Sequence, residues 1–205
     1  MARLLHIDAS PREARSKSRP VADAFLSALE GHEVETLDVW DEELPPLGGA
    51  MIEGRYSLIM GEPVDANLSA RWDAVRAHAE RFLSFDAVLL SVPMWNFGLP
   101  YRLKHYIDLI TQPGMAFTND AAGNVVGGAS HMRAVIIAAS AMPFGKDEAL
   151  SALDFQVRYL EAWMDFIGIE RRDIIRVSPT FGAAEDIART VKNAAADAAA
   201  LAASF

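Results

Sequence analysis

Three serines near the start of the chain, Ser10, Ser16 and Ser18, carry hydroxyl groups at a spacing that suits phosphate binding. The same segment holds four cations, which are Arg12, Arg15, Lys17 and Arg19. A predicted helix follows directly, and a helix N-terminus offers free N–H groups and a partial positive charge to an anion. The segment is therefore a candidate phosphate loop. The alternative is a solvated loop in which Ser16 or Ser18 only caps the helix.

A second loop, Pro93-Met94-Trp95-Asn96-Phe97, combines a proline, three large apolar side chains and one amide. A planar cofactor needs such apolar contact together with a few oriented backbone N–H groups. The loop is thus a candidate cofactor pocket. The alternative is that Met94, Trp95 and Phe97 pack into the core at the edge of a sheet.

A third loop begins with Ser140, Ala141 and Met142 and continues through Pro143 and Phe144. Small residues let a ligand approach the backbone closely, which makes this loop a candidate contact for the same ligand. A plain connection between a strand and a helix is the alternative.

Other chemistries are excluded by what the sequence lacks. The chain has no cysteine, so disulfides, thiolate zinc sites, iron–sulfur clusters and a cysteine nucleophile are ruled out. Its five histidines show no H-x-x-x-H spacing and no G-x-S-x-G motif occurs, so we expect neither a metal site nor a hydrolase triad. The net charge of −9 argues against nucleic acid and anionic membrane as partners. No stretch approaches the roughly 18 uninterrupted apolar residues of a membrane span.

The three loops must be positioned by the elements between them. Short β-rich apolar runs predict five strands, at 3–8, 33–39, 86–92, 132–139 and 172–177. Apolar residues at helical spacing predict helices at 20–29, 68–82, 99–110, 148–166 and 183–203. Ser69 is the predicted N-cap of the second helix, and Gly168 is the predicted stop of the fourth. The segment 40–67 is predicted to be irregular, and a loop of this length is usually functional or contains short helices of its own. The segment 114–128 is predicted to be an irregular or hairpin excursion.

Five strands that alternate with helices predict an α/β fold with one doubly wound parallel sheet. The length of 205 residues suits a single domain that spans 1–205. In such sheets ligands bind beyond the carboxyl ends of the strands, where the strand order reverses. The predicted loops after Asp8, Val92 and Ala139 leave these ends, so we expect the three candidate loops to converge there.

The stretch from Pro93 to Phe117, PMWNFGLPYRLKHYIDLITQPGMAF, is long and unusual. Together with the Ser10-Pro11-Arg12 and Ser16-x-Ser18 patterns, it resembles the FMN-dependent NADH-azoreductases, a flavodoxin-like family of NAD(P)H:quinone oxidoreductases. The likeness runs almost end to end. It implies a flavodoxin-like, five-stranded parallel sheet of order 2-1-3-4-5 with helices on both faces.

The resemblance also implies a function, which is two-electron transfer from NADH or NADPH to a quinone or azo acceptor by a ping-pong mechanism. The chemistry would be carried by bound FMN rather than by a catalytic side chain. The implied FMN contacts are Ser10, Arg12, Ser16, Lys17, Ser18, Pro93, Met94, Trp95, Asn96, Phe97, Ser140, Ala141 and Met142. The implied substrate contacts are Phe117 and Phe144. The family further implies a cytoplasmic homodimer with its active site at the interface.

The third loop departs from the family pattern, because Ser140-Ala141-Met142-Pro143 stands where Ser-Arg-Gly-Gly is usual. Pro143 has no N–H to donate to the flavin, whereas the N–H groups of Ala141 and Met142 remain. Two alternatives to the enzyme stay open. One is a flavodoxin-type electron carrier, although such carriers tend to have a T-x-T-G-x-T loop rather than S-x5-S-x-S. The other is a flavin-free binding protein on the same fold.

Overall fold

The computed structural model describes residues 1–144 and 150–205. Its main sheet contains five parallel strands in the order β2-β1-β3-β6-β7. The bounds of these strands are β1 (Ala2–Asp8), β2 (His32–Asp38), β3 (Ala87–Pro93), β6 (Arg133–Ala139) and β7 (Arg171–Val177). This is the predicted order 2-1-3-4-5, since the two short strands of a hairpin account for the difference in numbering.

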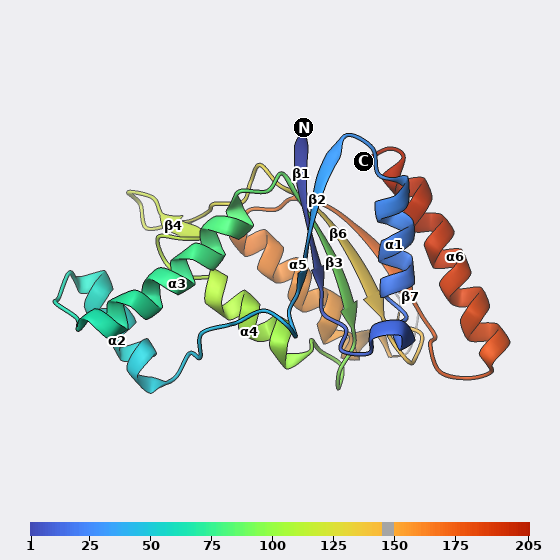
Figure 1. Ribbon diagram of the computed structural model, residues 1–205, viewed down its shortest axis with the longest axis horizontal. Helices are drawn as coiled ribbons and strands as arrows, with labels where there is room; N and C mark the ends of the chain where they lie inside the picture. The colour runs from blue at the N-terminus through green and yellow to red at the C-terminus, as the bar shows by residue number, and fades with distance from the viewer. Residues whose placement is uncertain (145–149) are drawn as a thin grey trace.

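Helices cover both faces of this sheet (Figure 1). Their bounds are α1 (Arg19–Ala28), α2 (Gly49–Met60), α3 (Ala66–Leu83), α4 (Tyr101–Ile110), α5 (Phe155–Ile167) and α6 (Ala184–Ala202). α1 and α6 share one apolar core with the strands, and α3, α4 and α5 share the other. The near-continuous apolar run of β3 follows from this position, because its residues face a core on either side. Within the described ranges, no helix is both long and apolar enough to cross a membrane.

The segment 40–67, predicted to be irregular, contains a helix of 12 residues, α2. The apolar residues of α2 show no helical period, which is why the sequence did not reveal it. Gly54 explains part of its packing. A Cβ at Gly54 would lie 2.2 Å from the side chain of Leu68, so the missing side chain lets α2 approach α3.

Two helices, α3 and α5, begin at other residues than predicted, and an aspartate is the N-cap of each. α3 begins after Asp65, whose Oδ1 accepts the N–H of Leu68 at 2.9 Å, so the predicted cap Ser69 is wrong. The predicted start of the fourth helix at residue 148 lies outside the described residues. α5 itself begins at Phe155, after Asp154 caps it. Gly168 ends α5 with a φ of 92°, which confirms the predicted stop.

The predicted hairpin is confirmed by β4 (Phe117–Asn119) and β5 (Val125–Gly127), which pair antiparallel. Its turn is held by Asp120, whose Oδ1 accepts the N–H groups of Ala122 and Asn124. The hairpin packs on the C-terminal end of α5, where the ring of Phe117 lies 4.7 Å from that of Phe166.

Candidate functional site

The three candidate loops start side by side at one end of the sheet, where the arrowheads of β3 and β6 point in Figure 1. Hydrogen bonds continue beyond the strands and join the loops. The N–H of Ala9 donates to the carbonyl of Ser91 at 3.0 Å, and the N–H of Met94 donates to that of Ala139 at 2.7 Å. The predicted convergence of the three loops is therefore confirmed.

The first loop buries all three of its serines, with 2% of Ser10, 4% of Ser16 and 1% of Ser18 exposed. Ser16 performs the capping role, because its Oγ accepts the N–H of Arg19 at 3.1 Å. Ser18 precedes the first residue of α1, yet its side chain caps no backbone N–H. Its Oγ lies 3.3 Å from the Oγ of Ser16. The capping alternative thus explains Ser16 but leaves the hydroxyl of Ser18 without that role.

Two backbone donors lie beside this hydroxyl. In the part of the chain that the structure describes, the N–H groups of Lys17 and Ser18 donate to no protein atom. Both precede the N-terminus of α1, where the helix adds a partial positive charge. These donors and the hydroxyl of Ser18 together form an arrangement that can bind an anion.

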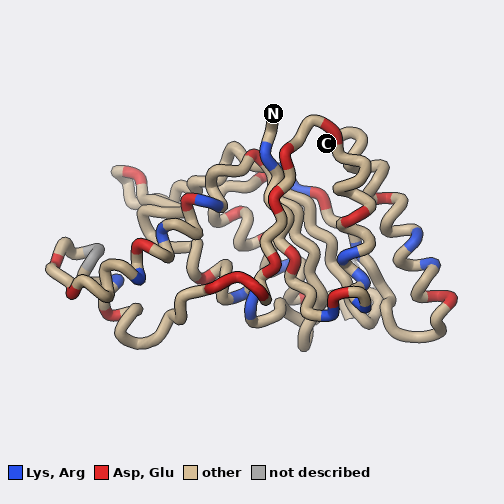
Figure 2. Tube along the Cα trace, viewed as in Figure 1, with Lys and Arg blue, Asp and Glu red and all other residues tan. Residues whose placement is uncertain are grey.

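The cations of the first loop differ in their availability. Arg12 and Arg15 are exposed, and Lys17 is half-buried. Arg19 instead forms ion pairs within the fold, with Asp8 at 2.5 Å and Asp38 at 3.2 Å. Burial alone would lower the pKa of Arg19, but the hydrogen bond and charge of Asp8 outweigh it and raise that pKa. Figure 2 shows the basic loop and the acidic run after β2 at the same end of the sheet.

The second loop forms a tight turn. The N–H of Trp95 donates to the carbonyl of Gly98 at 3.0 Å, and the N–H of Gly98 donates back at 2.9 Å. The two residues between them have positive φ angles, 46° at Asn96 and 72° at Phe97, as in a type I′ turn. Asparagine tolerates this conformation, whereas a phenylalanine there is strained. Strain of this kind is typical of functional loops.

Trp95 and Phe97 are 38% and 39% exposed, which excludes the alternative that they are simple core residues. Trp95 lies in an aromatic cluster, with its ring centroid 5.6 Å from that of Trp40 and 6.2 Å from that of Tyr101. The indole N–H of Trp40 donates to the carbonyl of Ala9 at 3.1 Å, which links the first loop to the second. The sequence reasoning missed Trp40 because it lies in the segment predicted to be irregular.

The third loop is held from two sides. Ser140 Oγ donates to the carbonyl of Met142 at 2.8 Å, and the carbonyl of Ser140 accepts from the N–H and Oγ1 of Thr180. Among the described residues, the N–H groups of Ala141 and Met142 have no protein acceptor. They remain as backbone donors next to Pro143, which has none.

A cavity of about 220 Å³ separates the second loop from the third. It is lined by Met94, Asn96, Phe97, Ala141, Met142 and Phe144. Five of these six residues belong to the predicted cofactor contacts, and the sixth, Phe144, was the predicted substrate contact. The apolar cavity between the second and third loops and the anion site of the first loop thus lie at the same end of the sheet.

Phe117, the other predicted substrate residue, lies elsewhere in the chain. It contacts Phe166, near the C-terminal end of α5. The second loop lies near the opposite end of α5, because Gly98 and Leu99 share a cleft with Phe155. Phe166 follows Phe155 by eleven positions in α5, which corresponds to a rise of about 16 Å.

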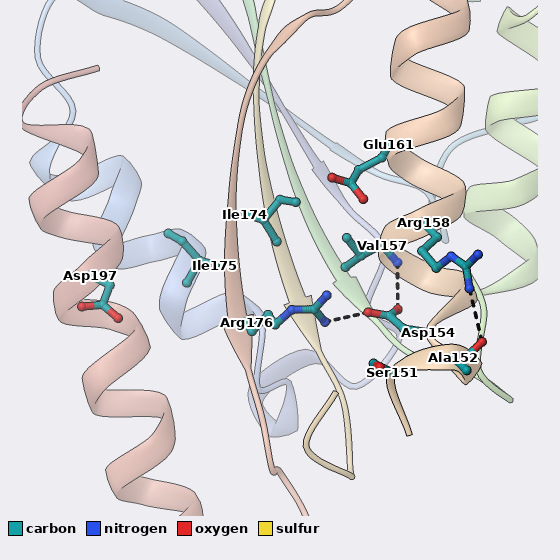
Figure 3. A pocket seen from close by; sticks show the side chains of 10 residues that line it. All are labelled: Ser151, Ala152, Asp154, Val157, Arg158, Glu161, Ile174, Ile175, Arg176 and Asp197. Atoms are coloured by element: carbon teal, nitrogen blue, oxygen red, sulfur yellow. Dashed lines mark hydrogen bonds and ion pairs between the residues drawn. The ribbon is translucent and has the colours of Figure 1, made fainter. Parts of the chain in front are cut away.

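A larger cavity of about 800 Å³ lies between α5, β7 and α6, at the edge of the sheet (Figure 3). No predicted site residue lines it. Its buried Asp154 caps α5 through the N–H of Val157 and pairs with Arg176 at 2.7 Å. This pairing fixes the start of α5 on β7. There the buried Gln156 donates from Nε2 to the carbonyl of Val92, at the base of the second loop. The sequence reasoning missed these supports because their partners are distant along the chain.

The described residues contain no cluster of three or more histidine, aspartate or glutamate side chains that could hold a metal ion. What the geometry offers is an anion site beside an apolar cavity with several backbone donors. Such an arrangement can hold a planar molecule that carries a phosphate.

Comparisons with known proteins agree with this geometry. Residues 2–202 match a protein family described as having a flavodoxin-like fold. An FMN-dependent NADH:quinone oxidoreductase from Ruegeria pomeroyi is 39% identical over 184 residues, which cover 88% of this chain and 90% of the relative. An FMN-dependent NADH:quinone oxidoreductase 3 from Pseudomonas fluorescens is 36% identical over 205 residues, which cover 97% of this chain and 94% of the relative.

Solved structures show the same fold at lower identity. An azoreductase from Bacillus anthracis superposes with a TM-score of 0.89 at 23% identity, and the match covers 100% of both chains. An FMN-dependent NADH-azoreductase from the same organism, solved in complex with FMN, gives a TM-score of 0.84 at 23% identity and covers 98% of this chain and 100% of that one. On the family match and the close relatives, the chain belongs to the flavodoxin-like family of FMN-dependent NADH:quinone oxidoreductases.

Proposed function

We propose that the protein is an FMN-dependent enzyme that transfers two electrons from NADH or NADPH to a quinone or azo acceptor. The names of its relatives support FMN as cofactor, NADH as donor and quinones as acceptors. The observation that carries the proposal is the placement of the anion site of the first loop beside the apolar cavity of the other two. We further propose that residues 1–205 form one FMN-binding domain, which works as a homodimer in the cytoplasm.

The residues of the first loop suit the phosphate of FMN. Within the described residues the N–H groups of Lys17 and Ser18 have no acceptor, and together with the buried hydroxyl of Ser18 they offer donors at the start of α1. Ser10 and Ser16 lie in the same buried loop. Arg12 is exposed in the same loop and would add positive charge for the phosphate.

The second and third loops suit the flavin ring. Met94 and Phe97 line the cavity with apolar surface, and Pro93 and Trp95 belong to the same loop. Asn96 lines the cavity from the turn and would contribute a backbone N–H to a ligand edge. Ala141 and Met142 offer backbone N–H groups from the facing loop, and the hydroxyl of Ser140 holds that loop in place. The chemistry that bound FMN supplies is two-electron transfer between a nicotinamide and an acceptor.

The protein's part in this reaction is to bind, orient and exclude water. Met142 and Phe144 give the cavity an apolar wall, which strengthens the polar contacts inside it. Among the described residues, no acidic or basic side chain lines this cavity, and in our proposal solvent supplies the protons.

We propose a ping-pong order of binding, in which donor and acceptor use the same open side of the site in turn, as the family resemblance implies. Reduced nicotinamide binds, reacts and leaves before the quinone or azo compound enters.

A homodimer accounts for the place of Phe117. Within one chain its ring lies far from the cavity, near the end of α5. In a dimer, the hairpin of one subunit can reach the cavity of the other, which gives Phe117 the substrate role that the family resemblance implies.

Steady-state kinetics test the proposal. The purified protein is loaded with FMN, and turnover is measured with NADH and with NADPH against a quinone and an azo dye. We expect flavin absorbance to stay with the protein and double-reciprocal plots to give parallel lines. A protein that stays colourless would instead be a flavin-free binding protein. A yellow protein that does not turn over with either donor would be an electron carrier.

A further inference from the structure

Asp8 ends β1 directly beneath the first loop and is only 2% exposed. Its Oδ1 accepts the N–H of Ser10 at 3.0 Å and lies 3.3 Å from the hydroxyl of Ser91. Its Oδ2 accepts from Nε of Arg19 at 2.5 Å. One buried carboxylate thus holds the beginning of the loop, the neighbouring strand β3 and the first residue of α1.

Arg19 extends this arrangement to β2. Its Nη2 donates to Oδ2 of Asp38 at 3.2 Å, and Asp38 is the neighbour of Asp8 in the parallel register. A cation at the first position of a helix is unfavourable in the field of the helix dipole. Here two carboxylates compensate that position, so the start of α1 is tied to the ends of β1 and β2.

A further neighbour is His6, which is buried and lies 3.0 Å from the hydroxyl of Ser91. Ser91 therefore joins His6 to Asp8 beneath the loop. The segments at the two ends of the first loop, Ser10 and Arg19, are both held by Asp8, while the donors Lys17 and Ser18 lie between them.

We propose that Asp8 is the positioning residue of the phosphate loop, and that Arg19 is bound by it as a clamp for the start of α1 rather than as the main ligand of the phosphate. This inference rests on the proposed function, because the ligand in question is FMN. In this proposal the negatively charged Asp8 favours binding of the FMN phosphate, because it holds the loop that binds it.

Whether removal of the charge of Asp8 strengthens or weakens FMN binding therefore decides between positioning and simple electrostatics. Coulomb's law alone predicts that removing the charge of Asp8 near a phosphate tightens FMN binding. Positioning predicts that the same change weakens it. Ser10 and Arg19 donate to different oxygens of Asp8, and an asparagine has only one acceptor oxygen, so it cannot keep both contacts in this geometry.

The experiment measures dissociation constants of FMN and riboflavin for the full-length apoprotein by quenching of flavin fluorescence. Riboflavin lacks the phosphate, so it reports the ring site alone. We expect Asp8→Asn to weaken FMN binding by about tenfold or more, as the loss of a charge-assisted hydrogen bond does, and riboflavin binding to change by less than about twofold.

Two further variants separate geometry from charge. Ser91→Ala keeps every charge but removes a hydroxyl that touches Asp8, and we expect FMN binding to weaken by about threefold. Asp38→Asn removes a carboxylate of the same cluster that does not touch Ser10, and we expect a change below about threefold.

Unchanged or tighter FMN binding by Asp8→Asn would overturn the inference, and so would an equal loss of FMN and riboflavin. If Asp8→Asn does not fold, Ser91→Ala decides, since electrostatics alone predicts no change for it. Wild-type protein that binds neither flavin would overturn the proposed function, and this inference with it. Wild-type protein that binds both while the variants match it would overturn this inference only.

Discussion

Trp95 and Gly98 exchange two backbone hydrogen bonds, of 3.0 and 2.9 Å, and so close a turn around Asn96 and Phe97 at the mouth of the cavity. The turn forces positive φ on two residues of which neither is glycine. Asparagine adopts such angles at little cost, whereas Phe97 stores strain. The fold therefore maintains Phe97 at this position although a glycine would be more stable there.

Phe97→Gly is expected to raise the free energy of unfolding by about 1 kcal/mol, because it removes the strain of a left-handed phenylalanine. The same change is expected to weaken FMN binding, since it deletes part of the cavity wall. Chemical denaturation of the apoprotein and fluorescence titration with FMN measure the two effects.

Asn96→Gly is the matched control, because asparagine already tolerates the left-handed region. We expect its free energy of unfolding to stay within about 0.5 kcal/mol of the wild type. A Phe97→Gly protein that is less stable than Asn96→Gly would contradict the interpretation of the turn.

Substitution of Ser16 is expected to affect mainly the stability of the protein, and substitution of Ser18 mainly its affinity for FMN. Ser16→Ala removes the hydroxyl that accepts from Arg19, so it should lower the stability of the apoprotein by about 1 kcal/mol. Ser18→Ala removes no cap, so its stability should change by less than about 0.5 kcal/mol. Its FMN affinity should nevertheless fall by about tenfold. Equal loss of stability in both variants would refute this division of roles.

Much of the fold follows from local patterns in the sequence. The apolar run of β3 and the strands on either side of it are confirmed to within about one residue. Such runs report burial on both faces of a parallel sheet. α2 was missed because its residues are placed by contact with α3 at Gly54 rather than by a helical period.

The candidate site was likewise predicted only in part from the sequence. The three loops were identified because the carboxyl ends of parallel strands share one edge. The contacts that hold these loops were not predicted, because they join distant residues. Asp8 pairs with Arg19 from another element, and Gln156 reaches the carbonyl of Val92 across 64 positions of the chain. Local sequence patterns carry no signal for such pairs.

His6 predicts a pH dependence of stability. Burial lowers its pKa, an effect that the charges of Asp8 and Asp23 oppose and that of Arg19 assists. The unfolded chain therefore binds more protons on this residue than the folded chain does. Stability is expected to decrease as the pH falls below about 6.5, with a slope of at most about 1.4 kcal/mol per pH unit.

Urea denaturation of the wild type and of His6→Gln between pH 7.5 and 5.5 checks this slope. The neutral glutamine should reduce it, because no proton is taken up at that position on unfolding. NMR titration of the folded wild type gives an independent control. A His6 signal that titrates at or above about 6.5 would disprove the prediction.

The missing side chain of Gly127 allows the hairpin to pack closely against the end of α5. A Cβ at this position would lie 2.1 Å from the backbone carbon of Ile167, which cannot move aside as a side chain could. Gly127→Ala should therefore lift the hairpin and lower the free energy of unfolding by about 1–3 kcal/mol. Gly48→Ala is the matched control, because nothing lies within 4 Å of its added Cβ, and it should change stability by less than about 0.5 kcal/mol.

If Phe117 reaches the partner's cavity, Gly127→Ala must also lower kcat/KM for the quinone, while FMN affinity stays unchanged. Full quinone turnover in this variant, at a temperature where it is folded, would exclude that role of the hairpin.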